Sequence, residues 1–350
     1  MRHSFENGVL DRQALNQGLL QSARLVGEYR GKEALFKQQS AQVLQALREN
    51  AVIQSTESSN RIEGVVATPQ RIRDLVANRT PPANRPEQEI AGYRDALNTI
   101  HTNFADMQLT SNLVLQLHRD LFQFVPSGGG RWKAADNDIM ETRPDGTTVI
   151  RFKPVAPHLT ADAMASLHDA YRTALDAGAV DPLLLIPTYV LDFLCIHPFA
   201  DGNGRMARLL SLLLLCKAGY EVGRYISLEG VIEETKEGYY DSLYASSQGW
   251  HEGQHSLVPW WEYFVGVMLV KAYREFENRV GVTHARRGAK REMIRDVVNR
   301  LPNGFRYADL QRSLPAVSRP TIARALRELR AEGAVRCVKG GRDATWEKTP

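Results

Sequence analysis

A short run in the middle of the chain brings together side chains suited to phosphate chemistry. Residues 197–208 read His-Pro-Phe-Ala-Asp-Gly-Asn-Gly-Arg-Met-Ala-Arg. His197 is the one group in the run whose ordinary pKa lets it accept a proton near neutral pH. Asp201 offers a hard oxygen ligand, and Mg²⁺ beside a diphosphate needs only one or two carboxylates. The run therefore holds a candidate base and a candidate metal ligand close together in the sequence.

The glycines of this run predict an anion site at the start of a helix. Apolar segments flank the run at 182–195 and 206–216, so we expect two buried helices joined by a short polar loop. Gly202 and Gly204 leave the backbone free to turn its N–H groups toward one point. The dipole of the second helix makes that point attractive to an anion such as a diphosphate.

Two arginines in the first turns of the second predicted helix complete the phosphate site. Arg205 and Arg208 lie three residues apart and can grip successive phosphates with planar guanidinium groups. Taken singly, each group has an ordinary explanation: a histidine can end a helix, Gly-Asn-Gly can form a turn, and arginines can be solvated. Together they would be costly to bury within an apolar run unless a ligand satisfied them.

The same run resembles the signature of the Fic family (filamentation induced by cyclic AMP). The family pattern is His-x-Phe-x-Asp/Glu-Gly-Asn-Gly-Arg-x-x-Arg, and residues 197–208 match it at every fixed position. Most family members are protein adenylyltransferases, which move AMP from ATP onto a Ser, Thr or Tyr hydroxyl of a target protein and release pyrophosphate. The resemblance implies ATP as substrate, Mg²⁺ or Mn²⁺ as the metal, and a mainly α-helical Fic-type bundle with a β-hairpin flap.

The resemblance also implies a role for each matched residue. His197 would be the general base that deprotonates the target hydroxyl, and Asp201 would hold the metal against the α- and β-phosphates. Arg205 would hold the β-phosphate and Arg208 the γ-phosphate. The anion hole would be formed by the backbone amides of three consecutive residues, Gly202, Asn203 and Gly204.

A second motif lies well before the first and suggests regulation. Residues 59–64, Ser-Asn-Arg-Ile-Glu-Gly, resemble the inhibitory motif Ser/Thr-x-x-x-Glu-Gly/Asn of the Fic subclass in which it is N-terminal to the catalytic domain. Helical spacing places Ser59 and Glu63 on one face, and Gly64 is suited to end the helix. The resemblance implies that Glu63 pairs with Arg208, so that ATP binds with a misaligned α-phosphate. The alternative is a pair of ordinary polar residues on an exposed helix face.

Residues on either side of the run 197–208 complete the expected site. The runs 139–142 and 147–152, which flank Pro-Asp-Gly at 144–146, predict a β-hairpin. The resemblance makes it a flap whose exposed edge holds an extended target segment by strand addition. Tyr240 and Leu243 fall where similar proteins build an adenine pocket, although aromatic residues at helical spacing usually belong to a core.

Length and charge predict more than one domain. The chain has 350 residues, of which 43% are hydrophobic, so it has material for more than one core. Residues 285–350 carry 16 Lys and Arg against 7 Asp and Glu, whereas residues 1–284 carry 28 against 33. We predict an N-terminal helical region with the inhibitory motif at 1–85, a Fic catalytic core at 86–280, and a winged helix-turn-helix domain at 285–350.

The basic C-terminal part has the element order of a winged helix-turn-helix. We expect helices at 289–300, at 307–314 and from Ser318 to about Glu332, followed by strands at 335–338 and 344–346 around Gly-Gly at 340–341. The third helix would be the recognition helix. Its expected outward-facing residues are Arg319, Thr321, Arg324 and Arg327. DNA binding and protein binding through residues 285–350 both stay open, because winged helices serve either purpose.

Other features bear on location and partners. The three cysteines, Cys195, Cys216 and Cys337, lack metal-ligand spacing, which favours reduced thiols in a cytoplasm and no zinc site. The richest apolar stretch, 209–216, is too short to cross a bilayer, so we expect a soluble protein without a membrane partner. The target protein, the modified residue type, self-modification and a homo-oligomer cannot be decided from the sequence.

Autoinhibited protein adenylylation is the favoured interpretation, and three alternatives remain. A phosphorylating branch of the family departs from the Gly-Asn-Gly-Arg pattern that this chain keeps. A relative that removes AMP would need Glu63 to position a water. The third alternative is a transcription regulator whose Fic core senses ATP while the winged helix binds an operator, with sequence-specific and salt-dependent binding.

Overall fold

The chain forms two compact units. The computed structural model describes residues 4–6, 8–39, 41–142, 146–285, 289–301, 303–314, 317–339 and 344–349. One unit consists of Met1–Ala34 and Gln42–Phe276, and the other of Leu35–Ala41 and Glu277–Pro350. The predicted division into 1–85, 86–280 and 285–350 is a division by function and stays a prediction.

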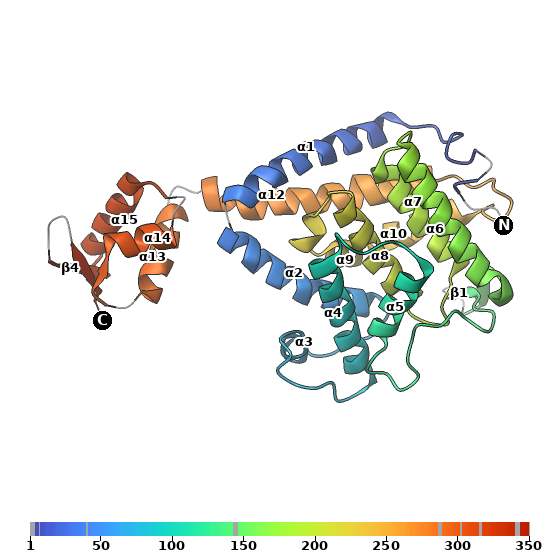
Figure 1. Ribbon diagram of the computed structural model, residues 1–350, viewed down its shortest axis with the longest axis horizontal. Helices are drawn as coiled ribbons and strands as arrows, with labels where there is room; N and C mark the ends of the chain where they lie inside the picture. The colour runs from blue at the N-terminus through green and yellow to red at the C-terminus, as the bar shows by residue number, and fades with distance from the viewer. Residues whose placement is uncertain are drawn as a thin grey trace. The chain divides into compact units, whose positions relative to one another are not determined.

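The first unit is mainly helical, as the sequence predicts (Figure 1). A π-helical segment, Glu262–Leu269, joins its last two helices, and no helix in the described part of the chain is long and apolar enough to cross a membrane. Its helices, the first and last of which run on into the second unit, are α1 (Gln17–Gln39), α2 (Ala41–Ile62), α3 (Pro69–Val76), α4 (Arg85–Asn103), α5 (Ser111–Leu121), α6 (Thr160–Ala177), α7 (Pro182–Ile196), α8 (Asn203–Lys217), α9 (Leu228–Glu234), α10 (Lys236–Ser247), α11 (Val258–Trp261) and α12 (Val270–Ala285).

Helices α7 and α8 lie in the core of this unit and confirm the two buried helices expected from the sequence. Both are buried along almost their whole length: α7 is apolar on nearly all faces, whereas α8 buries Arg205 and Arg208 together with its leucines. They pack against each other, α7 also packs against α6, α10 and α11, and α8 packs against α4 and α9. Asp181 caps the start of α7 by accepting a hydrogen bond from Leu183 N at 2.8 Å. The polar loop between these helices is therefore held at both ends by core elements.

Helix α4 packs closely against α5 and also against α8. A Cβ atom added to Gly92 of α4 would lie 2.0 Å from the carbonyl oxygen of Leu121, so only glycine permits this approach. Phe122 caps α5 at the end of this contact. The close packing brings the C-terminal turns of α5 next to the loop that precedes α8.

Helix α2 ends in a glycine turn, as the sequence predicts. Gly64 has a φ of +78°, the left-handed conformation that commonly ends a helix. Three backbone hydrogen bonds close the turn: Glu63 N to Asn60 O, Gly64 N to Arg61 O, and Val65 N to Asn60 O. Glu63 therefore lies one residue beyond the last helical residue, Ile62.

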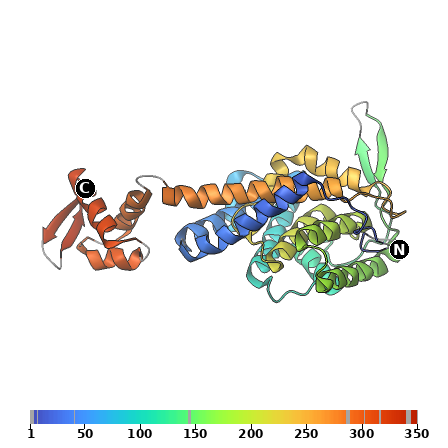
Figure 2. The ribbon, with the colours of Figure 1, turned by 90° about the horizontal axis from the view of Figure 1, so that it is seen from above.

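Two short strands form the predicted hairpin, which stands out from the helices of its unit in Figure 2. Strand β1 (Ile139–Thr142) pairs antiparallel with β2 (Thr148–Phe152), and the register places Met140 opposite Ile150. The predicted turn at 144–146 falls largely on residues 143–145, outside the described residues. Met140 and Ile150 are exposed hydrophobic residues on this hairpin.

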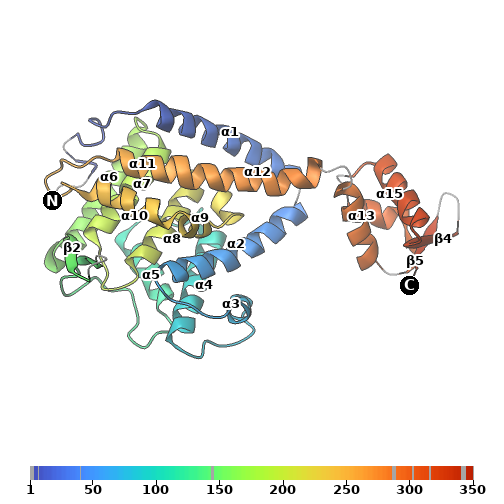
Figure 3. The ribbon, with the colours of Figure 1, turned by 180° about the vertical axis from the view of Figure 1, so that it is seen from behind.

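The second unit has its own core and a small sheet (Figure 3). Its strands β3 (Phe305–Arg306), β5 (Thr345–Lys348) and β4 (Val335–Lys339) form an antiparallel sheet in that spatial order. The buried core of the unit includes Ile294, Leu310, Ile322 and Leu329. The predicted Gly-Gly at 340–341 lies outside the described residues, and the winged helix-turn-helix assignment stays a prediction. The elements are α13 (Ala289–Arg300), β3 (Phe305–Arg306), α14 (Tyr307–Ser313), α15 (Arg319–Ala331), β4 (Val335–Lys339) and β5 (Thr345–Lys348).

Candidate active site

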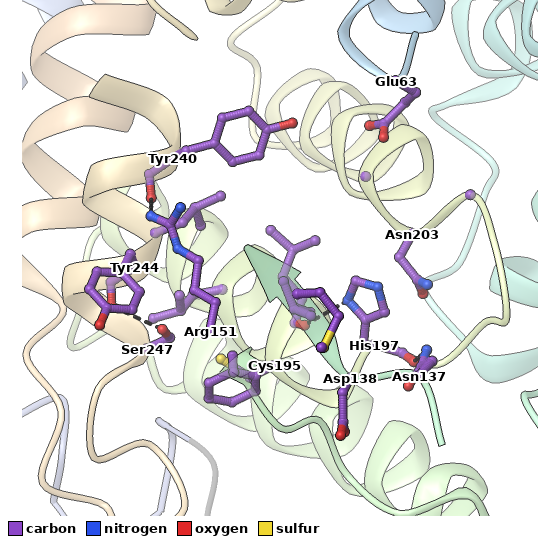
Figure 4. A pocket seen from close by; sticks show the side chains of 18 of the residues that line it. Glu63, Asn137, Asp138, Arg151, Cys195, His197, Asn203, Tyr240, Tyr244 and Ser247 are labelled. Carbon is purple, nitrogen blue, oxygen red and sulfur yellow. Dashed lines mark hydrogen bonds between the residues drawn. The ribbon is translucent and has the colours of Figure 1, made fainter. Parts of the chain in front are cut away.

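A cavity of about 490 Å³ in the first unit brings most of the predicted site residues together (Figure 4). The end of α2, the β-hairpin, the end of α7, the start of α8 and α10 form its walls. Ser59 and Arg205 are the two predicted site residues that do not line it. Those that do are Glu63, His197, Asp201, Gly202, Asn203, Gly204, Arg208, Tyr240 and Leu243.

His197 ends α7 and turns its ring into this cavity (Figure 4). Its φ of +50° breaks the helix, and its Nδ1 lies 3.2 Å from the carbonyl oxygen of Leu194. Nδ1 therefore carries the proton that it donates to this oxygen, and Nε2 keeps its lone pair. Burial lowers the pKa of His197 to about 4, and Lys133 acts in the same direction. The imidazole is thus neutral at pH 7 and able to accept a proton at Nε2.

Two asparagines fix the loop that follows His197. Asn203 accepts a hydrogen bond from Phe199 N at 2.9 Å and donates one to Phe199 O at 2.7 Å. Asn137 donates to His197 O at 3.0 Å and to Phe199 O at 2.8 Å. Lys133 Nζ holds Asn137 in place by donating to its Oδ1 at 2.7 Å. Side-chain amides therefore satisfy the carbonyl groups of a loop whose shape regular structure does not provide.

His118 of α5 supports the same loop from the side of the α4–α5 pair. Its ring stacks on Phe199 with centroids 3.7 Å apart and an angle of 1° between the planes. Gly130 N donates to His118 Nδ1 at 2.8 Å, so Nε2 carries the proton and donates to Asp201 O at 3.1 Å. Burial lowers the pKa of His118 to about 4, which keeps this tautomer neutral. His118 was not among the predicted site residues, because its helix was interpreted as part of the core around the site.

The Glu63 carboxylate lies against the start of α8, where the sequence predicts an anion site. Gly202, with a φ of +81°, precedes this helix and supplies no side-chain cap. A Cβ atom added to Gly204 would lie 2.3 Å from Glu63 Oε1, so the carboxylate rests directly against the first turn of α8. Burial acts to raise the pKa of Glu63, but the charge and hydrogen bond of Arg208 outweigh it, and the pKa is lowered. The carboxylate is therefore ionised where the helix dipole favours an anion.

Arg208 is buried and held by residues from the end of α2. It donates from Nη2 to Glu63 Oε1 at 2.8 Å and to Ser59 O at 3.0 Å, and from Nε to Ser59 Oγ at 2.8 Å. Its Nη1 is buried without a hydrogen-bond partner in the described part of the chain. Ser59 and Glu63 therefore share a face of the α2 terminus, as the helical spacing predicts, and both contact Arg208.

Arg205 points away from the cavity. Its Nη1 donates to Glu89 Oε2 of α4 at 2.6 Å, and its guanidinium lies 5.1 Å from the centre of the Phe122 ring. Asp201 Oδ1 is 3.5 Å from its Nη2. The structure thus separates the two arginines that the sequence analysis placed on successive phosphates, because Glu89 provides a buried partner for one of them.

Asp201 is a suitable ligand for Mg²⁺ only when a nucleotide supplies further oxygens. Its side chain is 59% exposed, lines the cavity, and accepts a hydrogen bond from Gly202 N at 2.6 Å. Among the described residues no three His, Cys, Asp or Glu side chains gather around one point that could hold a metal. Mg²⁺ keeps several waters and needs one or two carboxylates beside substrate phosphates, so the donor set fits the ion in that setting.

The opposite wall of the cavity joins the hairpin to α10. Tyr240 and Leu243 of α10 line the cavity, as does Arg151 of β2. Arg151 Nη2 donates to Tyr240 O at 3.2 Å, and its guanidinium lies 4.5 Å from the centre of the Tyr244 ring (Figure 4). Arg151 was not predicted as a site residue, because its contact with Tyr240 joins two segments that are 89 residues apart and share no sequence pattern.

Comparison with known proteins agrees with the motif at the cavity. Residues 108–215 match the model of the Fic/DOC family. Protein adenylyltransferase fic-1 of Caenorhabditis briggsae is 26% identical over 171 residues, which are 47% of this chain and 30% of that protein. Protein adenylyltransferase Fic of Drosophila virilis is 28% identical over 209 residues, which are 57% of this chain and 40% of that protein. The chain therefore spans less than half the length of these relatives.

The fold agrees with solved Fic structures. A Fic family protein from Desulfovibrio desulfuricans matches with a TM-score of 0.66 at 20% identity, over 96% of this chain and 97% of that one. A Fic domain containing signaling protein from Bacteroides thetaiotaomicron matches with a TM-score of 0.60 at 21% identity, over 73% of this chain and 98% of that one. At these identities the likeness concerns the fold alone, and it supports the mainly helical Fic-type architecture with a small antiparallel sheet.

Proposed function

We propose that the first unit is a protein adenylyltransferase, which transfers AMP from ATP to a Ser, Thr or Tyr hydroxyl of a target protein, and that Glu63 inhibits it. One observation carries the proposal. A single cavity contains a neutral histidine, an exposed carboxylate and a helix N-terminus, and an ionised glutamate lies at that N-terminus. The names of the relatives support AMP as the transferred group.

The chemistry follows from the position of His197. The target hydroxyl oxygen attacks the α-phosphorus of ATP, and its proton passes to Nε2 of His197. The bond between the α-phosphorus and the bridging oxygen breaks, and pyrophosphate leaves. The backbone N–H groups at the start of α8 and the guanidinium of Arg208 stabilise charge on the phosphate oxygens. No covalent bond to the enzyme is needed, because positioning and electrostatic stabilisation carry the reaction.

Asp201 is the residue that would hold Mg²⁺, or Mn²⁺ in its place. When bound, this ion would neutralise charge on the α- and β-phosphates. The predicted β-phosphate contact of Arg205 would require its guanidinium to leave Glu89, so we assign the phosphate grip to Arg208 and to the amides of residues 202–204. Tyr240 and Leu243 remain the proposed adenine contacts.

Glu63 would inhibit the reaction because its carboxylate and a phosphate of ATP compete for the same site. The carboxylate rests against Gly204 and binds Arg208, which are groups that a phosphate of ATP would use. Two anions cannot share this site, because they repel each other and need the same donors. ATP bound beside Glu63 would therefore sit with its α-phosphate displaced from the line of attack.

The β-hairpin is the proposed docking place for the target. Its strands are short and β1 and β2 pair only with each other among the described strands, so a backbone edge is available for an extended segment. Main-chain hydrogen bonds position a hydroxyl with little demand on the neighbouring side chains. Self-modification is consistent with such recognition and is measured in the same experiment as target modification.

The decisive experiment follows transfer of label from ATP labelled at the α-phosphate. Wild type, Glu63→Gly, and Glu63→Gly combined with His197→Ala are incubated with Mg²⁺, alone and with cell lysate. We expect strong labelling by Glu63→Gly and none by the double variant. Glu49→Gln is a matched control, since Glu49 is an exposed carboxylate of α2 that bonds Gln45 and lies outside the cavity.

Two results would overturn the proposal. Labelling from γ-labelled ATP instead of α-labelled ATP would indicate phosphoryl transfer. Absence of labelling by every variant, together with loss of AMP from a modified protein that requires Glu63, would indicate that the enzyme removes AMP and that Glu63 positions a water.

A further inference from the structure

The second unit presents a row of arginines on one face of α15. The face toward the core of the unit is apolar and buried, and consists of Ile322, Ala325, Leu326 and Leu329. The other side of the helix carries exposed arginines at Arg319, Arg324, Arg327 and Arg330. The Arg324 side chain is 71% exposed.

The negative charges at α15 are directed toward α13. Glu328 is the only carboxylate within α15, and its Oε2 lies 3.6 Å from Nε of Arg291 on α13. Glu332, which caps the helix, pairs with Arg291 and Arg295. Arg324 lies 3.8 Å from Glu328, at the edge of this cluster. The ion pairs therefore gather the carboxylates on one flank, and the exposed face between Arg319 and Arg330 keeps its positive charge.

The start of α15 is also suited to an anion. Its first turn contains no acidic residue, and Pro320 occupies one of its first two positions. Tyr307 fixes this end of the helix, because its hydroxyl donates to Arg319 O at 2.9 Å while the Arg319 guanidinium lies 5.7 Å from the centre of its ring. The hydroxyls of Ser318 and Thr321 lie 2.8 Å apart beside the first turn. The hydroxyls, the backbone N–H groups and the arginines at this helix end are all hydrogen-bond donors suited to a phosphate.

We propose that the second unit binds double-stranded DNA with the exposed face of α15 in the major groove. A groove about 12 Å wide accepts an α-helix, and arginines serve both phosphates and guanine edges. Residues 285–350 contain 16 Lys and Arg but only 7 Asp and Glu, and this net positive charge attracts a polyanion. The relatives' names assign no such activity to this region, and the proposal does not depend on the reaction in the first unit.

Fluorescence anisotropy of the full-length protein tests the proposal. The probe is a labelled duplex of mixed sequence, about 30 base pairs long, which is about three helical turns. The test variant is Arg324→Gln with Arg327→Gln. The matched control is Arg79→Gln with Arg172→Gln in the first unit, where the side chains are 72% and 65% exposed, so both variants lose the same charge from exposed arginines.

We expect wild type to bind the duplex with an affinity that falls as salt increases. Only the test variant should bind more weakly and with a smaller salt dependence. Each lost phosphate contact lowers the slope of log K against log salt by about 0.9, so the slope should fall by about 2. The affinity should fall at least about tenfold, because each substitution removes charge-assisted hydrogen bonds to the DNA. The control should bind as wild type does, and the thermal unfolding of all variants should coincide.

Three results would overturn the proposal. Wild type that does not bind the duplex at about 50 mM salt lacks even the non-specific affinity expected of such a face. Equal loss in the test and control variants would show a general effect of net charge. Equal affinity for the duplex and for its separated strands would exclude groove binding by α15, and a protein partner would then be the next candidate for this face.

Discussion

The Glu63 carboxylate and the Arg208 guanidinium meet at 2.8 Å beside the first turn of α8, in the cavity that also contains His197. Removing only the charge of Glu63 should therefore activate the enzyme. We expect Glu63→Gln to increase AMP transfer by about tenfold or more, since a hydrogen bond between charged groups contributes about 1.5–3 kcal/mol. The measurement is the initial rate of label transfer, with Glu49→Gln as control. Equal rates for wild type and Glu63→Gln would contradict inhibition by this ion pair.

The pH dependence of the activated enzyme should report the lowered pKa of His197. The base acts in its neutral form, so activity is lost as the pH falls through the pKa of His197 in the folded protein. Burial lowers that pKa to about 4. Glu63 acts to raise it, so the Glu63→Gly variant should lower it further. We expect kcat/KM to stay constant down to about pH 5, and an inflection near 6.5, the ordinary histidine value, would contradict a buried base.

His118 should act as a positioning residue for the loop between α7 and α8, which contains Phe199 and Asp201. In the Glu63→Gly background, His118→Ala removes the hydrogen bond to Asp201 O and the stacking on Phe199. We expect kcat to fall about 10- to 100-fold, because small displacements of a reacting geometry are costly. His118→Gln keeps an N–H donor and should recover part of the loss. If both variants lose activity equally, or lose only thermal stability, the positioning role is wrong.

The buried ion pair between Arg205 and Glu89 should contribute to stability rather than to nucleotide binding. Glu89→Ala removes the buried partner of the Arg205 guanidinium and leaves only the exposed Asp201 carboxylate, at 3.5 Å; breaking a buried ion pair in this way typically costs about 3–5 kcal/mol. The matched control is Glu28→Ala, because Glu28 pairs with Arg24 on an exposed face of α1, where such pairs contribute at most about 1 kcal/mol. Urea denaturation measures the free energy of unfolding of both variants and of wild type. A loss of less than about 1 kcal/mol for Glu89→Ala would show that Arg205 does not depend on Glu89.

The sequence predicted those parts of the site that are close together in the chain. The spacing of His197, Asp201 and the glycines fixes them at the junction of two helices, whatever surrounds it. The glycine after Glu63 likewise identifies the end of α2. Local sequence determines these features because helix ends and turns depend on neighbouring residues.

The remainder depends on contacts between distant segments. Arg205 and Arg208 both lie in the first turns of α8, and the sequence does not distinguish their roles. In the structure Arg205 binds Glu89, 116 residues away, and Arg208 binds Glu63, 145 residues away. The support of the loop by His118 and Asn137 also joins separate elements. Only a resemblance to known proteins indicated the pairing of Glu63 with Arg208 in advance, because no periodic pattern links α2 to α8.

Glu63 belongs to the turn that closes the C-terminus of α2, and helix ends open at the lowest free-energy cost in a folded protein. Three backbone hydrogen bonds hold this turn, and the exposed Arg61 side chain adds a contact, since its nitrogen lies 3.0 Å from an oxygen of the half-buried Glu233. Fraying of this one turn would withdraw the carboxylate while α7 and α8 keep their packing. The proposed inhibition by Glu63 therefore has the local stability of a helix terminus, and a partner that prefers the frayed turn would relieve it without rearranging the core.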